Sequence, residues 1–192
     1  MANAGDRTLA RRGALAVLAM EAIASWSNVE AFMLSFFVTL LGGETLASTV
    51  YLALDGSGPK MAAIRAAASA ALGATPERLS LFRALLDIAK TNQKARDKLA
   101  HWTWGYSPQL PDALLLVDPK ALSLLDRKDI LVYKDTDFEE IISANDRLCG
   151  YCMDFGFVLQ DHPANAGNRL FEGLCAQPEI REWLSRRSGQ RD

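Results

Sequence analysis

The chain has 192 residues, of which 49% are hydrophobic, and this is enough to bury the core of one domain. Its formal net charge of -2 excludes a protein that covers nucleic acid with its whole surface, so any contact with nucleic acid must be local. Three cysteines do not make a disulfide framework, and they favour a reducing compartment.

The most apolar segment lies near the start of the chain, at residues 9–41, where apolar residues recur at the three-and-four spacing of a helix. A membrane-spanning helix needs about 20 consecutive apolar residues. Glu21 and Glu30 interrupt this run, with Asn28 between them. We therefore expect a buried helix of a cytoplasmic protein that does not contact a membrane, with a bend near Trp26.

The rest of the chain predicts further helices and one short β segment. A dense cluster of turn residues occupies 55–59, and Thr75-Pro76-Glu77 has the order of a helix start. Beyond Gly105 two prolines exclude a continuing helix, and two short apolar runs follow. The expected elements are helices at 44–54, 61–72, 76–101, 135–159 and 171–187, strands at 113–117 and 130–133, and one or two helical turns at 119–125.

These elements predict a mainly α fold, with a small two-strand β insertion after the fourth helix and further C-terminal helices. No linker long enough to separate domains interrupts the chain, so we expect a single domain over 1–192. Its expected parts are a helical core at 7–105, a loop and β-hairpin-like insertion at 106–135, C-terminal helices at 136–187 and a flexible tail at 188–192.

One stretch, residues 90–106, differs from the rest of the chain in its chemistry. It concentrates four cations and one acid, and then one of the two histidines and three large aromatic residues. Arginine suits a phosphate because its planar fork donates two parallel charge-assisted hydrogen bonds, and histidine exchanges a proton near neutral pH. Arg96 and His101 are therefore a minimal set of groups for moving a phosphoryl bond, with no metal or cofactor expected.

Helix geometry sets a condition on this pair. Asp97 and His101 are four residues apart and share one face, so we expect the carboxylate to accept a hydrogen bond from the ring and to fix its tautomer. Arg96 points roughly 140° away from His101 on a straight helix with 3.6 residues per turn. The two meet on one phosphate only if the helix unwinds near Ala100 or if a second copy, related by a twofold axis, completes the site.

The run Arg96-Asp97-Lys98-Leu99-Ala100-His101 resembles the signature of the HEPN superfamily, an arginine and a polar residue followed by a histidine. The resemblance covers roughly residues 9–105 and implies a HEPN-like helical bundle, a homodimer and a metal-independent endoribonuclease of the kind found in toxin–antitoxin and phage-defence systems. It implies that Arg96 stabilises the phosphate, that His101 transfers a proton and that Asp97 supports them. The implied reaction is attack of the ribose 2′-hydroxyl on the adjacent phosphate. Two positions depart from the family pattern, because Asp97 stands where asparagine is frequent and Thr103 stands where some members have tyrosine.

Five residues around the pair are candidate RNA contacts. The aromatic rings can stack on unpaired bases, a contact worth about 1–3 kcal/mol per base, and the lysines form a stripe that can follow a phosphate backbone. The alternatives are that at least two of the rings close the core and that the lysines belong to an ordinary solvated face. The candidates are Lys94, Lys98, Trp102, Trp104 and Tyr106.

Two alternative functions stay open. The same architecture suits a non-catalytic module that binds RNA, a nucleotide or an acidic partner, and an antitoxin or another regulatory protein is a candidate partner in either case. The second alternative is a zinc-stabilised adaptor, although its ligand spacing is irregular and small buried side chains are the simpler role for the cysteines. Its ligands would be Cys149, Cys152, His162 and Cys175.

Overall fold

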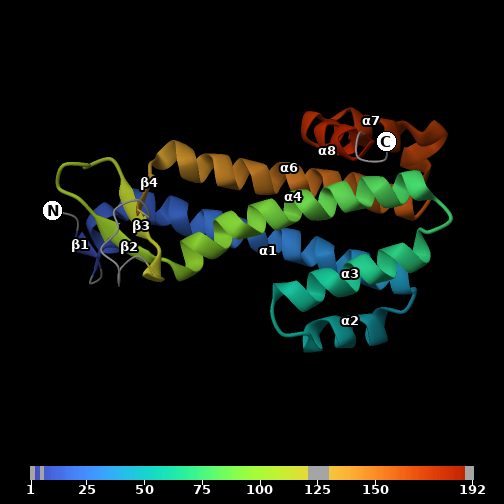
Figure 1. Cartoon of the computed structure of the whole chain (residues 1–192), viewed down its shortest axis with the longest axis horizontal. Helices are drawn as coiled ribbons and strands as arrows, with labels where there is room; N and C mark the ends of the chain where they lie inside the picture. The colour runs from blue at the N-terminus through green and yellow to red at the C-terminus, as the bar shows by residue number, and fades with distance from the viewer. Residues whose placement is uncertain (1–2, 5–6, 121–129, 189–192) are drawn as a thin grey trace. The chain divides into compact units, whose positions relative to one another are not determined.

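The computed structural model describes residues 3–4, 7–120 and 130–188 (Figure 1). This part of the chain is mainly helical and carries a small antiparallel sheet, which confirms the mainly α class. The helical turns predicted at 119–125 fall largely outside the described residues, as does most of the tail predicted at 188–192.

The chain divides into two compact units, each assembled from two separate stretches. The first unit consists of Met1–Ser27 and Thr91–Asp146, and the second of Asn28–Lys90 and Arg147–Asp192. The sequence predicted a single domain and contained no sign of this division. The reason is that every boundary falls inside a long helix, where the hydrophobic pattern continues without a break.

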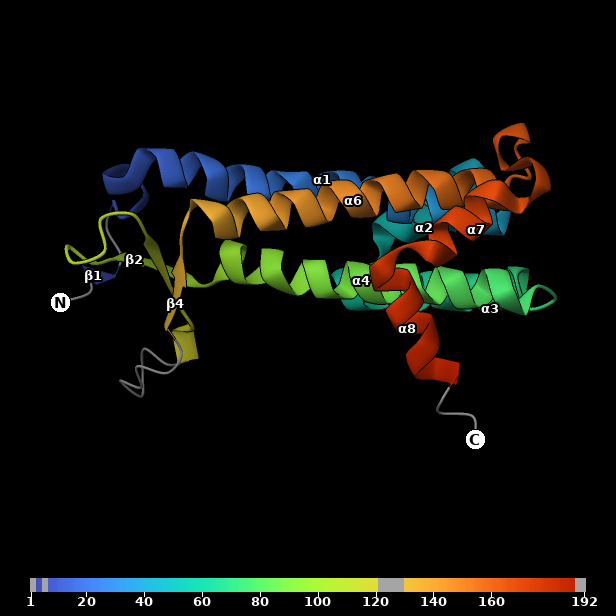
Figure 2. The ribbon, with the colours of Figure 1, turned by 90° about the horizontal axis from the view of Figure 1, so that it is seen from above.

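Three helix segments and the sheet form the first unit. The short 3-10 helix η1 (Leu9–Arg12) leads into α1 (Gly13–Leu41), and the end of α4 (Pro76–His101) and the start of α6 (Asp135–Leu159) belong to the same unit. Figures 1 and 2 both show these segments close together beside the sheet. Their apolar side chains meet in one buried cluster made of Ala19, Ala22, Leu99, Leu114, Leu116 and Phe138.

A buried polar contact joins two helices of this unit. Asn145 on α6 is fully buried, and its Nδ2 donates to Ser25 Oγ on α1 at 2.8 Å. The Ser25 hydroxyl in turn donates to the carbonyl of Ala22 at 3.1 Å. A buried donor without a partner costs about 1–3 kcal/mol, so this bond favours the observed alignment of α1 with α6.

The sheet is antiparallel throughout, in the order β1-β2-β3-β4. All four residues of β3 are buried, as expected of a central strand. The two predicted strands are confirmed as β3 and β4. Strands β1 and β2 were missed, because β1 has only two residues and Gly105 interrupts the apolar pattern of β2. The strands are β1 (Asn3–Ala4), β2 (Thr103–Tyr106), β3 (Leu114–Val117) and β4 (Ile130–Tyr133).

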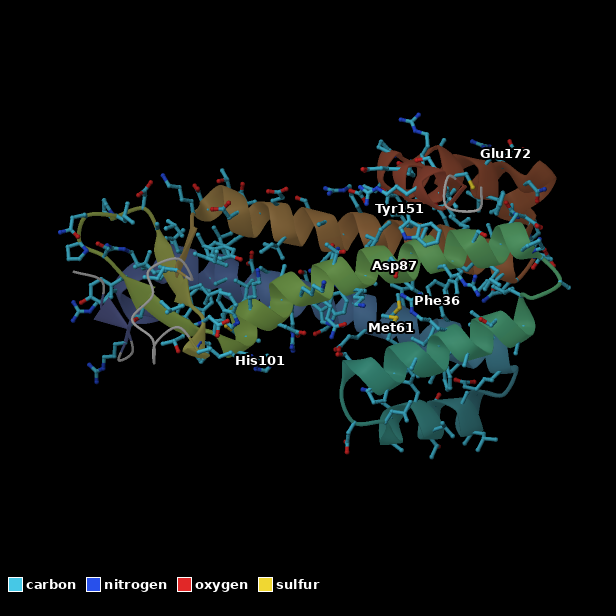
Figure 3. All side chains as sticks on the ribbon, viewed as in Figure 1. Phe36, Met61, Asp87, His101, Tyr151 and Glu172 are labelled. Carbon is cyan, nitrogen blue, oxygen red and sulfur yellow. The ribbon has the colours of Figure 1, made fainter. Side chains whose placement is uncertain are left out.

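The second unit has an aromatic core. Phe36 of α1, Phe82 of α4 and Phe155 of α6 are buried together, with the ring centroid of Phe82 5.1 Å from each of the other two. The carboxylate of Asp87, which is labelled in Figure 3, accepts from Arg65 Nη2 at 2.6 Å and from Trp183 Nε1 at 2.8 Å. The shorter helices of this unit are α2 (Glu44–Ala53), α3 (Ser57–Ala71), η3 (Pro163–Asn168), α7 (Arg169–Ala176) and α8 (Pro178–Ser188).

Three predicted helix details were wrong. Helix α3 begins at Ser57, inside the turn cluster expected at 55–59, because Gly56 alone supplies the turn with a φ of 76°. The helix expected at 171–187 is two helices, since Gln177 is extended before Pro178, as a residue preceding proline prefers. Helix α1 runs through Trp26 without interruption.

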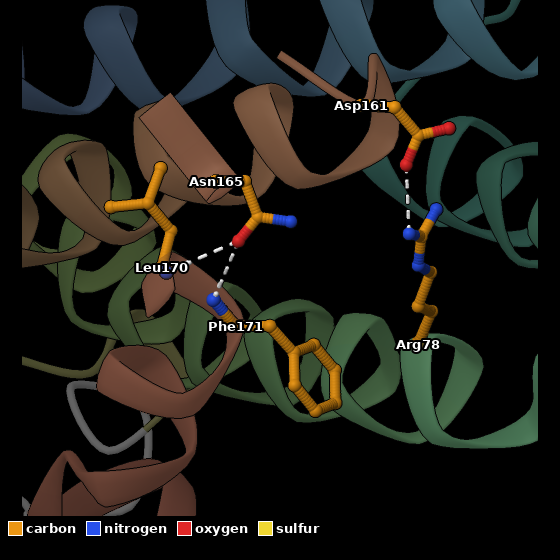
Figure 4. Close-up of polar contacts among 5 residues, drawn as sticks. All are labelled: Arg78, Asp161, Asn165, Leu170 and Phe171. Carbon is orange, nitrogen blue, oxygen red and sulfur yellow. Dashed lines mark hydrogen bonds and ion pairs between the residues drawn. The ribbon is translucent and has the colours of Figure 1, made fainter. Parts of the chain in front are cut away.

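The connection between α6 and α7 is held by side-chain hydrogen bonds. Asn165 is buried, and its Oδ1 accepts from the backbone N–H groups of Leu170 at 3.1 Å and Phe171 at 3.2 Å (Figure 4). These donors lie in the first turn of α7, where a helix has no intrahelical acceptor for them. Arg78 pairs with Asp161 at 2.8 Å and attaches the same connection to the start of α4.

Among the described residues, one helical segment, Leu9–Leu41, is long and apolar enough to cross a membrane by length and composition. Core helices of soluble proteins pass the same test. The buried helix expected here is buried on one face only, since Val17 is 58% exposed and Met20 57%. A single segment of this kind is weak evidence for a membrane and is consistent with a soluble protein.

Leu99→Ala is expected to lower the free energy of unfolding by about 2–5 kcal/mol, because Leu99 is fully buried in the first unit's cluster and its truncation leaves a cavity. Leu46→Ala is the matched control, since the Leu46 side chain on α2 is 75% exposed, and it should change that free energy by about 0.5 kcal/mol or less. Urea unfolding followed by circular dichroism measures both. Equal losses in the two variants would contradict the packing of Leu99.

Candidate functional site

The charged end of α4 is continuous helix up to the residue where the sheet begins. Helix α4 runs from Pro76 to His101, and the backbone N–H of Trp102 still donates to the carbonyl of Lys98 at 2.9 Å. Strand β2 then starts at Thr103. The helix therefore does not unwind near Ala100, which was one of the two ways in which Arg96 and His101 could have met.

Arg96 is paired with its neighbour in the chain. Its Nη1 lies 3.2 Å from Asp97 Oδ1, and Gln93 Nε2 donates to the other carboxylate oxygen at 3.5 Å. The Arg96 side chain is 30% exposed and that of Asp97 is 43% exposed. The Nε of Arg96 is buried and has no hydrogen-bond partner among the described residues. The guanidinium is thus partly covered, with one edge held by a carboxylate.

His101 is the last residue of α4, and it is exposed (Figure 3). The expected hydrogen bond between Asp97 and His101 is wrong, because in the described part of the chain the Asp97 carboxylate pairs with Arg96 and Gln93 instead. On an unbroken helix Arg96 and His101 point roughly 140° apart. One copy of the chain therefore does not bring these two side chains to a common phosphate.

The two candidate lysines differ in their surroundings. Lys94 is exposed, so its ammonium group is available to a ligand. The Nζ of Lys98 instead lies 5.3 Å from the centre of the Trp102 ring, a cation–π contact within the same helix end. Lys98 and the acceptor carbonyls of the last turn also attract one another, since cations are favoured near a helix C-terminus.

Two of the three candidate stacking rings belong to the core. Trp102 and Trp104 are half-buried and pack against the cluster around Leu99 and Phe138, with the rings of Trp104 and Phe138 6.3 Å apart. Trp104 lies on β2 opposite Leu116 of β3, which fixes its backbone in the sheet. The structure therefore favours the packing alternative for both tryptophans over stacking on bases.

Tyr106 ends β2 beneath an arginine from the other end of the sequence. The guanidinium carbon of Arg11 lies 5.1 Å from the centre of the Tyr106 ring. The neighbouring Arg12 donates through Nη2 to the carbonyl of Ser107 at 3.5 Å. Both arginines belong to η1, so this helix places additional positive charge next to β2. The sequence alone did not indicate that these arginines lie near Tyr106.

No group of three or more His, Cys, Asp or Glu side chains in the described part of the chain could hold a metal ion. The proposed zinc ligands Cys149, Cys152, His162 and Cys175 are all described, and they do not form such a group. Burial is the main cause that raises the pKa of the Cys152 thiol, and the neighbouring Cys149 raises it further. A buried thiol of this kind is a small apolar side chain rather than a nucleophile.

No family model, no curated protein and no solved structure matches the chain.

Trp104→Ala is expected to destabilise the fold by on the order of 2 kcal/mol or more, because the ring packs on Phe138 and the strand pairing holds it there. Tyr106→Phe keeps the ring under Arg11 and should change stability by about 0.5 kcal/mol or less. Thermal unfolding and RNA binding are measured on both variants. A Trp104→Ala protein that unfolds like the wild type but binds RNA less tightly would contradict a packing role.

Proposed function

We propose that this chain is a HEPN-type endoribonuclease that cleaves RNA without a metal, with Arg96 and His101 as catalytic residues. The observation that carries the proposal is the set of side chains on the last turns of α4. Arg96 is partly exposed there and, among the described residues, is paired only with Asp97, and His101 is exposed at the helix end. Lysines lie on the same turns. Arginine and histidine supply the two functions that a metal would otherwise supply, charge stabilisation and proton transfer.

Arg96 is available to a phosphate despite its contact with Asp97. An ion pair between partly exposed side chains is worth about 0–1 kcal/mol, so little is lost when it opens. A phosphate accepts two parallel hydrogen bonds from the guanidinium, which are stronger than ordinary hydrogen bonds. Asp97 therefore acts as a positioning residue that holds the guanidinium until the RNA phosphate replaces it.

The continuous helix makes a second copy part of the proposal. Because Arg96 and His101 point apart on α4, each phosphate would meet Arg96 from one copy and His101 from the other. A twofold axis between two α4 ends supplies both residues twice with one sequence. The active form in this account is a homodimer with two composite sites.

The proposed reaction is transesterification. The ribose 2′-hydroxyl attacks the adjacent phosphorus, its proton is taken up by a base, and the departing 5′-oxygen gains a proton from an acid. His101 moves one of these protons, while the Arg96 N–H groups stabilise the charge that builds on the non-bridging oxygens. The products are a 2′,3′-cyclic phosphate and a 5′-hydroxyl end. Lys94 would attract the neighbouring phosphates, with Lys98 and Tyr106 as further contacts.

The biological setting in this proposal follows from the resemblance alone. A metal-independent endoribonuclease of this type would act in the cytoplasm, in a toxin–antitoxin or phage-defence system, and an antitoxin or another regulatory protein would restrain it.

A non-catalytic module of the same kind is the second candidate function. The observation that favours it is the contact between Arg96 and Asp97, which places a negative charge next to the phosphate site and leaves His101 without its expected partner. Such a module would bind RNA or an acidic partner through the exposed cations of α4 without cleaving it.

His101→Ala is expected to reduce RNA cleavage in the presence of EDTA by at least about 100-fold, the usual contribution of a general acid or base. The matched control is His162→Ala, which removes the other histidine of the chain and lies in the second unit, and its cleavage rate should equal that of the wild type. Cleavage that is equal in all three proteins, or absent from wild type across varied RNAs, would remove the enzymatic proposal. RNA binding without cleavage would favour the non-catalytic module.

Mixing two inactive variants tests whether the site is shared between copies. Arg96→Ala and His101→Ala should each be inactive alone, and an equimolar mixture should recover about a quarter of wild-type activity, because half of the dimers are mixed and each holds one intact composite site. A mixture of Arg96→Ala with the double variant Arg96→Ala/His101→Ala is the control and should stay inactive. Failure of the first mixture to recover activity, with exchange of subunits verified, would show that the residues do not combine across copies.

A further inference from the structure

A hollow of about 270 Å³ lies between α4 and α6 in the first unit, close to β4. Its size is below the roughly 300–1,000 Å³ of pockets that hold drug-sized ligands, so it suits one small molecule or one long side chain. Figure 2 shows α6 beginning directly after β4, which brings a strand residue to the same place. The lining residues are Thr91, Asn92 and Ala95 of α4, Tyr133 of β4, and Asp137, Glu140, Ile141 and Ala144 of α6.

The lining carries two carboxylates, and the Lys134 ammonium group acts on one of them, Asp137, at longer range. Asp137 and Glu140 lie three residues apart on one face of α6, where like charges repel by a few tenths of a kcal/mol. Neither carboxylate belongs to an ion pair among the described residues. Lys134, beside the start of α6, has its Nζ 2.7 Å from Asp112 instead. A ligand with a positive charge would relieve this repulsion.

The acceptors are arranged beside an apolar surface. Asp137 uses Oδ2 to accept from the backbone N–H of Lys134 at 2.7 Å, which leaves Oδ1 for a ligand. The side-chain nitrogen of Asn92 is buried and has no partner among the described residues. That nitrogen has almost no accessible surface, so the acceptors for a ligand are the two carboxylates. Ala95, Ile141 and Ala144 supply the apolar wall.

Tyr133 lies close enough to the Asp137 carboxylate to be affected by its negative charge. Burial is the main cause that raises the pKa of its hydroxyl, and the Asp137 carboxylate raises it further. One face of the ring is stacked on Phe138, with centroids 5.4 Å apart, so the ring is held in place as part of the wall. A fixed aromatic ring next to two carboxylates attracts a flat cation by cation–π contact as well as by charge.

We propose that this hollow binds an alkylguanidinium group. Its N–H groups would donate hydrogen bonds to the carboxylates of Asp137 and Glu140. Its alkyl chain would pack on Ala95, Ile141 and Ala144. A guanidinium fits better than a simple ammonium because its planar fork serves two carboxylates at once and stacks on aromatic rings. The ligand is either a free small molecule or an arginine side chain of a protein segment. The lining of the hollow does not include His101, so the proposed binding does not depend on whether the chain cleaves RNA.

The test uses the full-length protein and three probes, with binding measured by NMR chemical-shift titration. Agmatine represents the free alkylguanidinium, the peptide Gly-Gly-Arg-Gly-Gly represents a protein segment, and N-butylurea is a comparable molecule without the charge. Binding of agmatine or of the peptide should reach saturation and should change the chemical shifts of Tyr133 and Glu140. N-butylurea should bind at least about tenfold more weakly, because it cannot form charge-assisted hydrogen bonds. The tighter of the two charged probes identifies the source.

Glu140→Gln and Glu139→Gln form a matched pair for this site. Both residues are exposed neighbours on α6, but only Glu140 lines the hollow. Glu140→Gln should lower the affinity for the charged probes by about tenfold, and Glu139→Gln should leave that affinity unchanged. Circular dichroism melting shows that both variants fold. The proposal is overturned if neither charged probe saturates at millimolar concentration, if N-butylurea binds as tightly, or if both variants lose affinity equally.

Discussion

The hydrogen-bond ladder of α4, which continues to the contact between the Trp102 N–H and the Lys98 carbonyl, constrains the rest of the candidate site. It keeps residues 96 and 101 on different faces, so one copy does not join the arginine and the histidine. The same continuous helix determines which side chains at its end are packed and which are exposed to solvent. The chain enters β2 at once, which commits Trp102 and Trp104 to the core and leaves the exposed Lys94 and His101 as polar groups facing solvent.

Several side chains near the end of α4 are packed against other elements of the first unit. Leu99 anchors the helix end in the apolar cluster, and Asn92 and Ala95 form one wall of the hollow shared with α6. Arg96 lies one helical turn after Asn92 and is partly covered and paired with Asp97. Such a pair costs little to open, so the same residue can serve a resting arrangement and an RNA-bound one. Arg96 therefore lies on the same side of α4 as Asn92 of the hollow, whereas His101 points away from Asn92.

The position of α4 was predictable because its signals are local: Pro76 at the start and the glycine and prolines after His101 at the end. Strands β3 and β4 were predictable for the same reason. The partner of Asp97 was not, because Arg96 and His101 are both within its reach and the choice depends on side-chain rotamers. The burial of Trp104 and the hollow beside Tyr133 depend on segments that meet only in the fold, so no spacing along the sequence revealed them.

Amide hydrogen exchange at Trp102 tests the central claim, the continuity of α4 through His101, most directly. If the ladder is intact, the Trp102 amide exchanges slowly, like the amides of the preceding turn, and sequential NMR contacts of helical type continue to His101. Fast exchange at Ala100, His101 and Trp102, with loss of those contacts, would show that the helix unwinds there. In that case a single copy could bring Arg96 and His101 together, and the requirement for a second copy would be contradicted.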